Sequence, residues 1–336
     1  MKKVRWAVVG IGGIADRRPV PAILKDDIGE LVAVMDRVEE VAREKGEKYG
    51  VPYFVTEAEM LRSVECDAVY IGTPVACHYE QAMLALQYGK HVFIEKPLAM
   101  NEAQARAIVD AFRAAGKQIT VGYMMKHHNL HEKAKTLIAA DGIGEVNTVR
   151  VGLSCWYPAI AGAWRQNPTL GGGGAIMDLG VHCVELVEYL LDDEIDEVKA
   201  LYHTRTFSYE VEDGGVIIFR TKGGVLGHID VNFNVPDLAA ESKLELYGTK
   251  GYIICRGTLG QEEAGTLSHL YAPQGDYSAM QSRTTSEPVT YAAEGADLYL
   301  KQIHAFSELL TANQTDYTYA DRAVQVQGVI DRIYRN

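Results

Sequence analysis

Short apolar runs alternate with longer amphipathic stretches through the first third of the chain. Each apolar run is followed by enough sequence to hold a helix, which is the rhythm of repeated β-α-β units. The pattern predicts an α/β domain in which a doubly wound parallel sheet is covered by helices on both faces. The expected strands lie at 4–9, 31–35, 68–71 and 91–94, and the expected helices at 39–49, 57–63, 78–88 and 101–115.

The pattern changes after about Gly122. A helix is expected at 131–140, a strand at 146–156, and an apolar helix that runs to Leu191. Two more helices are expected at 297–312 and 320–334.

Between these helices, residues 195–256 alternate in polarity and turn often, as an antiparallel sheet does. Glycines at 214–215, 223–224 and 248–251 are the expected hairpin connections. We therefore predict two domains, an α/β domain over 1–122 and an α+β domain over 123–336, and the last helix can pack back on the first domain.

Composition agrees with a chain of two globular domains. The 336 residues are 47% hydrophobic and 23% charged, so there is apolar material for two cores. A net charge of -12 argues against nucleic acid as a partner. No apolar run is long enough to span a membrane, and the charged and proline residues at 16–19 interrupt the only signal-like start. The five cysteines are odd in number and form no Cys-x-x-Cys pair, which favours a cytoplasmic protein with reduced thiols.

A glycine-rich turn directly follows the first strand and precedes a helical segment. Its residues are Gly10, Ile11, Gly12, Gly13, Ile14 and Ala15. In this context glycines let the backbone approach a diphosphate, so the turn predicts a dinucleotide site, although an ordinary glycine turn is the simpler alternative. Asp36 ends the second strand at the spacing expected for a carboxylate that binds the adenosine ribose, which favours NAD. Arg37 beside it keeps NADP as an alternative.

Residues after the third and fourth strands fall at the same edge of the predicted sheet. Glu95-Lys96-Pro97 closes the fourth strand, where ligands bind in open α/β folds, so Lys96 is a candidate for chemistry. Thr73-Pro74 and His78 follow the third strand and are candidates to wall the cofactor. The alternatives are a solvated lysine at a strand end and an ordinary Thr-Pro strand exit.

Four glycines at 171–174 lead into a helix that carries Asp178 and His182. These two residues are four apart, so they share one helical face, where the carboxylate can orient or stabilise the imidazole. With Glu185 and Tyr189 they form a polar stripe, for which a solvated helix face is the simpler explanation. The histidines at 127, 128 and 131 lack a matching set of Cys or carboxylate ligands, so we expect no metal.

As a set, these motifs resemble the Gfo/Idh/MocA family of oxidoreductases, and the resemblance runs from end to end. It includes the glycine turn, Gly72-Thr73-Pro74 with His78, Glu95-Lys96-Pro97, Gly122-Tyr123, Trp164-Arg165, and 174–182. It implies an N-terminal Rossmann domain and a C-terminal domain with an open, mostly antiparallel sheet that serves in oligomers. The family pattern differs at Lys126-His127, where relatives commonly have Arg-Phe, and at Val75, where they often have Asn.

The resemblance also implies that Lys96, Asp178 and His182 face the nicotinamide, and it places Glu95 with the cofactor residues. A histidine has an ordinary pKa of about 6.5, whereas bringing a lysine from about 10.4 to about 7 costs about 4.6 kcal/mol. We therefore expect His182 to be the acid or base, Asp178 its electrostatic partner, and Lys96 the cation that polarises the reacting oxygen. The candidates to line a polyhydroxylated substrate are Tyr123, His128, Trp156, Trp164 and Arg165.

The leading hypothesis is an NAD(P)-dependent dehydrogenase or reductase of a sugar, cyclitol or sugar derivative, acting as a homodimer or homotetramer. Two alternatives stay open. One is an NAD-dependent enzyme that cleaves glycosides by transient oxidation and elimination. The other is a non-catalytic sensor that binds NAD and a protein partner.

Overall fold

The computed structural model describes residues 3–273, 275, 279 and 286–335. The chain divides into two compact units. The first unit comprises residues 1–124, 167–172 and 297–328, and the second comprises 125–166, 173–296 and 329–336. Among the described residues, no helix has the length and apolar character needed to cross a membrane.

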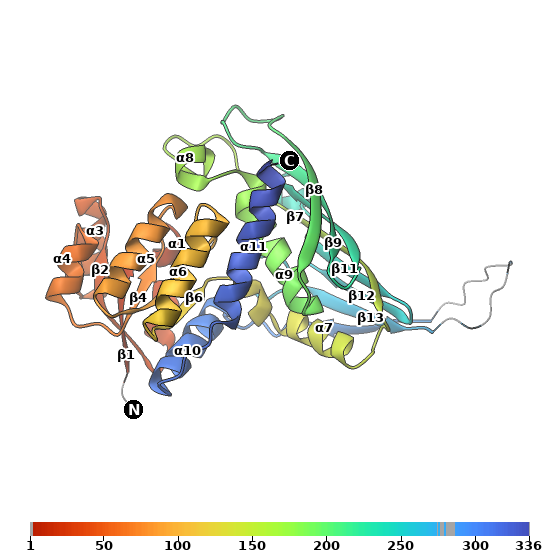
Figure 1. Ribbon diagram of the computed structural model, residues 1–336, viewed down its shortest axis with the longest axis horizontal. Coiled ribbons are helices and arrows are strands. Elements are labelled where there is room, and N and C mark those ends of the chain that lie inside the picture. Colours follow the sequence, from red (N-terminus) through yellow and green to blue (C-terminus); the bar gives the residue numbers. More distant parts are fainter. Residues whose placement is uncertain (1–2, 274, 276–278, 280–285, 336) are drawn as a thin grey trace. The chain divides into compact units, whose positions relative to one another are not determined.

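The first unit is built on a six-stranded sheet flanked by helices (Figure 1). Its strand order is β3-β2-β1-β4-β5-β6, and all neighbouring strands are parallel. The four residues of β4 are all buried, as expected for a strand covered on both faces. The strands are β1 (Val4–Val9), β2 (Gly29–Met35), β3 (Tyr53–Phe54), β4 (Ala68–Ile71), β5 (His91–Ile94) and β6 (Ile119–Val121). The helices are α1 (Ile14–Arg17), α2 (Pro19–Lys25), α3 (Glu39–Tyr49), α4 (Glu57–Ser63), α5 (His78–Gln87), α6 (Glu102–Ala114), α8 (Pro168–Gly171) and α10 (Leu298–Thr311).

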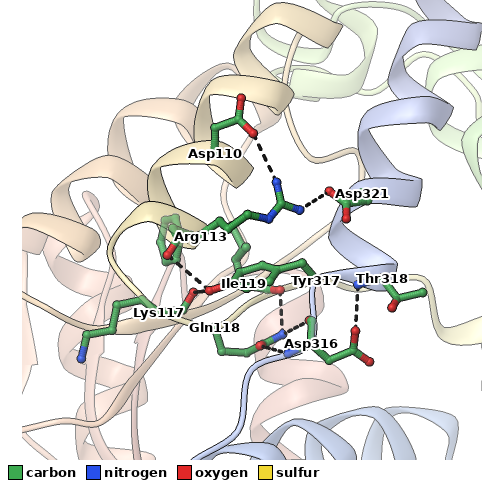
Figure 2. Close-up of polar contacts among 10 residues, drawn as sticks. Asp110, Arg113, Lys117, Gln118, Ile119, Asp316, Tyr317, Thr318 and Asp321 are labelled. Atoms are coloured by element: carbon green, nitrogen blue, oxygen red, sulfur yellow. Dashed lines mark hydrogen bonds and ion pairs between the residues drawn. The ribbon is translucent and has the colours of Figure 1, made fainter.

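Hydrogen bonds and an ion pair join residues 316–321 to the end of α6 and the residues just before β6 (Figure 2). The buried Gln118 side chain donates to the Asp316 carbonyl at 2.7 Å and accepts from the Asp316 N–H at 2.8 Å. The Tyr317 hydroxyl donates to the Lys117 carbonyl at 3.0 Å, and Arg113 pairs with Asp321 at 2.5 Å. These contacts lie just before and within the first turns of α11 (Thr318–Arg335) and attach the segment 297–328 to the first unit.

The second unit is built on an eight-stranded sheet with the order β14-β13-β12-β11-β7-β10-β9-β8. Every neighbouring pair is antiparallel except β7 and β10, which are parallel. The helices α7 and α9 pack against this sheet (Figure 1). The strands are β7 (Val146–Ser154), β8 (Ile195–His203), β9 (Gly214–Thr221), β10 (Leu226–Asn232), β11 (Lys243–Gly248), β12 (Gly251–Arg256), β13 (Thr266–Tyr271) and β14 (Val289–Ala292), and the helices are α7 (Asn129–Ala139) and α9 (Val181–Leu191).

The predicted fold classes are confirmed, and the structure corrects one turn and adds four strands, β3 and β6 in the first unit and β13 and β14 in the second. Gly214 and Gly215 open β9 and are not a hairpin connection, because both pair with β8 on one side and β10 on the other. Glycine is needed at 215 because the Ile176 side chain occupies the space of a Cβ there. The hairpins at 223–224 and 248–251 are confirmed. The strands β3 and β6 have only two and three residues, which is too short for a periodic signal.

Candidate active site

The expected cofactor residues meet at the carboxyl edge of the parallel sheet in the first unit. The glycine turn follows β1, Asp36 follows β2, Thr73 follows β4, and Glu95 with Lys96 follows β5. Since β2, β1, β4 and β5 are adjacent and parallel, their carboxyl ends lie at one edge. The sequence prediction for this set therefore agrees with the observed topology.

Direct contacts join the members of this edge. At Gly10 the backbone has a φ of 79°, and a Cβ there would lie 2.6 Å from the Thr73 side chain, so only glycine fits beside the end of β4. Beside Gly13 no atom lies within 4 Å of the place of a Cβ, which leaves open space for a ligand. The glycine turn therefore fits a diphosphate, which peptide N–H groups would bind.

The helix behind the glycine turn is short. It ends after the four residues of α1, and α2 begins at Pro19. A proline carries no N–H, so it starts a new helix more readily than it continues one. The N–H groups of Gly10 and Ile11 donate to the Met35 carbonyl, and that of Gly12 donates to Asp36. An anion would therefore be bound by the N–H groups from Gly13 to the start of α1.

Asp36 is held against the glycine turn. Its Oδ2 accepts from the Gly12 N–H at 3.2 Å, and its Oδ1 accepts from the Val38 N–H at 3.0 Å. The carboxylate thus stands beside the turn, where it would repel a 2′-phosphate and accept from ribose hydroxyls. The neighbouring Arg37 is exposed.

The carboxyl group of Glu95 is buried and fixes the residue before Lys96. The Tyr70 hydroxyl from β4 donates a short hydrogen bond to Glu95 Oε1, and the carboxyl group lies 3.4 Å from the place of a Cβ at Gly122. The Glu95 N–H donates to the Ile71 carbonyl at 2.9 Å. Three neighbouring strands, β4, β5 and β6, thus meet at this residue, and Lys96 follows it directly.

His78 joins the loops after β4 and β5. Its ring nitrogens lie 2.9 Å from the Pro97 carbonyl and 3.0 Å from the Thr73 carbonyl. Burial lowers the pKa of His78 to about 4, so at pH 7 the ring is neutral and donates to one of these carbonyls at a time. His78 therefore holds the loops that carry Thr73 and Lys96, a role the sequence did not reveal.

In the second unit, Asp178 has a cationic partner. It lies in a π-helical turn, Ile176–Gly180, that continues directly into α9, where His182 is the second residue. The Arg165 Nε donates to Asp178 Oδ1 at 3.1 Å, and the guanidinium lies 4.3 Å from the centre of the Trp164 ring. Arg165 was expected to line the substrate, and the structure shows it holding the Asp178 carboxylate. His182 is buried, with 6% of its surface exposed.

Aromatic rings gather next to Arg165. Tyr157 interacts with its guanidinium, and burial raises the pKa of the Tyr157 hydroxyl. The half-exposed Trp156 meets the Phe207 ring edge-on at 5.1 Å, and Phe207 stacks on Tyr209 at 5.4 Å. These three rings therefore pack on one another.

Two expected substrate residues are buried. Tyr123 is 1% exposed and belongs to the first unit. His128 is fully buried and begins α7: its Nδ1 accepts from the Leu130 N–H at 3.1 Å, and its Nε2 lies 2.9 Å from the Ala264 carbonyl. These contacts give His128 a structural role as a helix cap.

His131, another of the histidines considered as metal ligands, also has a structural role. His131 lies 2.8 Å from the Met125 carbonyl and 2.9 Å from the Thr258 hydroxyl. Burial lowers the pKa of His131 to about 3, so the ring stays neutral. Its two nitrogens hold the fold together at the start of α7.

Four residues that contact the candidate site residues or the segment that carries them have no motif in the sequence: Tyr70, Tyr157, Glu212 and Tyr334. Each acts through a partner at least eight residues away in sequence, and no local motif announces it. For Glu212 and Tyr334 the only signal was indirect, namely the run of glycines at 171–174.

Comparisons with known proteins identify both halves of the chain. Residues 4–123 match the model of an oxidoreductase family with an NAD-binding Rossmann fold, and residues 131–254 match that of the GFO/IDH/MocA C-terminal domain. A 1,5-anhydro-D-fructose reductase from Ensifer adhaerens is 32% identical over 79% of this chain and 79% of its own. A dTDP-3,4-didehydro-2,6-dideoxy-alpha-D-glucose 3-reductase from Streptomyces violaceoruber is 33% identical over 81% of this chain and 75% of its own.

The fold matches solved structures over almost the whole chain. A 3-ketoreductase from Actinomadura kijaniata, solved with NADP and TDP-benzene, has a TM-score of 0.85 and 22% identity, and the match covers 99% of this chain and 98% of that one. At this identity the likeness concerns the fold. Together with the two sequence relatives and the two family matches, it places the chain in the Gfo/Idh/MocA family of NAD(P)-binding oxidoreductases.

Proposed function

We propose that this protein transfers a hydride between a nicotinamide dinucleotide and a secondary alcohol or ketone of a sugar, cyclitol or sugar derivative. The observation that carries the proposal is the edge of the parallel sheet where the glycine turn, Asp36 and Lys96 follow adjacent strands. The sugar reductases named above support the substrate class.

Side chains of this protein would transfer the proton of the substrate hydroxyl. The dinucleotide, when bound, supplies or accepts the hydride. Lys96, fixed through Glu95, would donate a hydrogen bond to the reacting oxygen. His182 would give or take the proton as the general acid or base. Asp178 would stabilise the charged imidazole, and Arg165 would hold the Asp178 carboxylate in place.

Asp36 supports a preference for NAD over NADP. Both carboxylate oxygens are tied to backbone N–H groups at the glycine turn, so the negative charge is fixed where a 2′-phosphate would have to lie. Arg37 is the group that would favour the phosphate instead.

A substrate screen tests the proposal. The purified protein is mixed with NADH or NADPH and 1,5-anhydro-D-fructose, and with NAD or NADP and D-xylose, D-glucose, myo-inositol or a methyl glucoside. The absorbance of the reduced nicotinamide and the release of free sugar from the glucoside are followed. Turnover of one of these sugars is expected. Cleavage of a glycoside with no net change in absorbance would contradict the dehydrogenase and favour the lyase-like alternative, and dinucleotide binding with neither reaction would favour the sensor.

We also propose that the second domain, over 123–336, binds the substrate and joins copies of the chain. The face of its sheet formed by β8, β9 and β10 carries Leu201 (84% exposed), Val216 (48%), Ile218 (57%) and Leu226 (57%). Such a patch on adjacent strands is typical of an interface. The ion pair of Glu197 and Arg220 borders it, so the charges at this edge of the patch are neutralised within one chain and do not oppose the approach of a second copy. A second copy is the occupant, giving a homodimer or homotetramer.

Light scattering after size exclusion tests the oligomer. The wild-type chain should have two or four times the mass of one subunit, and Ile218→Glu should reduce it to one. A monomeric wild-type protein would contradict the interface.

We propose that the protein is cytoplasmic. All five cysteines fall within the described residues and are free thiols, which suits a reducing compartment.

A further inference from the structure

One buried carboxylate caps the helical segment that carries Asp178 and His182. Glu212 Oε1 accepts from the Gly174 N–H and the Ile176 N–H, each at 2.9 Å, and the Glu212 carbonyl accepts from the Ala175 N–H at 3.0 Å. Three consecutive N–H groups thus donate to one residue, which is 6% exposed. N–H groups at a helix start have no partner within the helix, so Glu212 supplies it from a distant part of the chain.

A tyrosine on α11 completes the arrangement. The Tyr334 hydroxyl donates to the same Glu212 Oε1 at 2.6 Å, and its ring meets the Tyr202 ring edge-on at 5.7 Å. Burial, with the neighbouring Glu212, raises the pKa of Tyr334 well above its ordinary value, so the hydroxyl keeps its proton and remains a donor. Oε1 therefore has three donors, and its position is fixed from two sides.

The glycines at 173 and 174 are explained by this arrangement. A Cβ at Gly173 would lie 2.1 Å from the Tyr334 hydroxyl, and a Cβ at Gly174 would lie 2.0 Å from the Glu212 carbonyl oxygen. Both distances are far below van der Waals contact. These two glycines thus let the helix start approach Glu212 and Tyr334 closely.

The capped segment leads straight to the proposed proton-transfer residues. The Asp178 N–H donates to the Gly174 carbonyl at 2.9 Å, so Asp178 stands one turn after the capped N–H groups. A shift of Gly174 would pass directly to Asp178 and, through the continuous helix, to His182. A displacement of about 1 Å in a reacting group can cost about a hundredfold in rate.

We infer that Glu212 and Tyr334 are positioning residues for the proposed reaction, because together they set the place of the turn that carries Asp178 and leads into the helix of His182. The inference rests on the proposed function, since positioning matters only if those two residues act in turnover. It assigns to Glu212 and Tyr334 an effect on kcat and none on dinucleotide binding, whose residues belong to the first unit.

Tyr334→Phe is the direct test, because it keeps the ring beside Tyr202 and removes the hydroxyl donor. We expect kcat to fall about ten- to hundredfold, measured with whichever of 1,5-anhydro-D-fructose, D-xylose or myo-inositol the wild-type enzyme turns over fastest. The Kd for NADH, from its fluorescence, should stay as in the wild type. Hydrogen exchange of a peptide spanning 173–182 should become faster, while peptides from β4 and β5 stay protected.

Tyr317→Phe is the matched control. It removes a tyrosine hydroxyl that donates to the Lys117 carbonyl just before the same helix, so it should lower the melting temperature and leave kcat unchanged. A Tyr334→Phe enzyme that also keeps its kcat and its protection at 173–182, with only a lower melting temperature, would overturn the inference.

Glu212→Gln serves as the second variant if Tyr334→Phe does not fold. The amide oxygen can still accept from the two N–H groups but lacks the charge, so the same loss of kcat, in smaller measure, is expected. Wild-type kcat in this variant would overturn the inference. A wild-type enzyme with no turnover of any tested sugar would instead count against the proposed function, and hydrogen exchange at 173–182 would still decide whether the cap orders the turn.

Discussion

Removal of the Tyr70 hydroxyl tests how the residue before Lys96 is held. Tyr70 is fully buried on β4, where its ring stacks on Phe93 at 5.7 Å, and its hydroxyl donates to Glu95. Tyr70→Phe keeps the ring and its packing. It therefore deletes one hydrogen bond to a buried carboxyl group and leaves almost no cavity.

The expected loss can be worked from this geometry. Hydrogen bonds to charged groups contribute about 1.5–3 kcal/mol, and an acceptor left buried without its donor adds to the cost of the change. For a domain of 150–250 residues, each kcal/mol shifts the melting temperature by about 2–4 °C, so the first unit should melt about 3–12 °C lower. Because Glu95 directly precedes Lys96, kcat should fall too.

Calorimetry and steady-state kinetics give the two readouts, with Tyr317→Phe as the control. The control loses a hydrogen bond to a main-chain carbonyl in the same unit, so it should lower the melting temperature less and keep its kcat. A Tyr70→Phe protein that melts with the wild type would refute the reasoning that this hydroxyl stabilises the site.

Three further changes have defined outcomes. Gly174→Ala places a Cβ 2.0 Å from the Glu212 carbonyl oxygen, so urea unfolding should show a loss of about 3 kcal/mol or more, and wild-type stability would contradict the close approach. Asp36→Ala should raise the Kd for NADH about tenfold and reduce the preference for NADH over NADPH, and an unchanged ratio of the two Kd values would argue against Asp36 as the discriminating residue. The hydrogen bond to buried Asp26, at 2.8 Å, raises the pKa of His304, with Asp27 and Glu308 adding to the effect. The stabilisation by the protonated His304 is therefore fully present below the ordinary histidine pKa and is lost as the pH rises through the raised pKa. The wild type should melt higher than His304→Ala at pH 5.5, and the difference in melting temperature should become smaller by pH 9. A difference that stays constant would contradict this.

The sequence was enough to predict the architecture, because the features that define it are local and periodic. The strands β1, β2, β4 and β5 are buried apolar runs, and α3, α4, α5 and α6 lie where their patterns predict. The exceptions have physical reasons. Gly214 and Gly215 look like a turn in sequence, yet both lie in β9. At Gly215 the missing side chain leaves room for the Ile176 side chain, a contact that only the folded chain reveals.

The site was predictable only in part. The glycine turn and Asp36 could be placed because a parallel sheet brings strand ends to one edge. The pairing of Asp178 with Arg165 and the cap of Glu212 with Tyr334 could not, because each joins segments separated by a loop or a whole sheet. The interval between Glu212 and Tyr334 is 122 residues, and no local pattern records it.

The central claim is that His182 exchanges a proton with a sugar while a nicotinamide dinucleotide exchanges the hydride. The most direct measurement compares wild-type protein and His182→Ala in one experiment, with NADH binding followed by fluorescence and turnover of the best sugar from the screen followed by absorbance. We expect His182→Ala to bind NADH as tightly as the wild type and to lose nearly all turnover. Full turnover in His182→Ala would contradict the account.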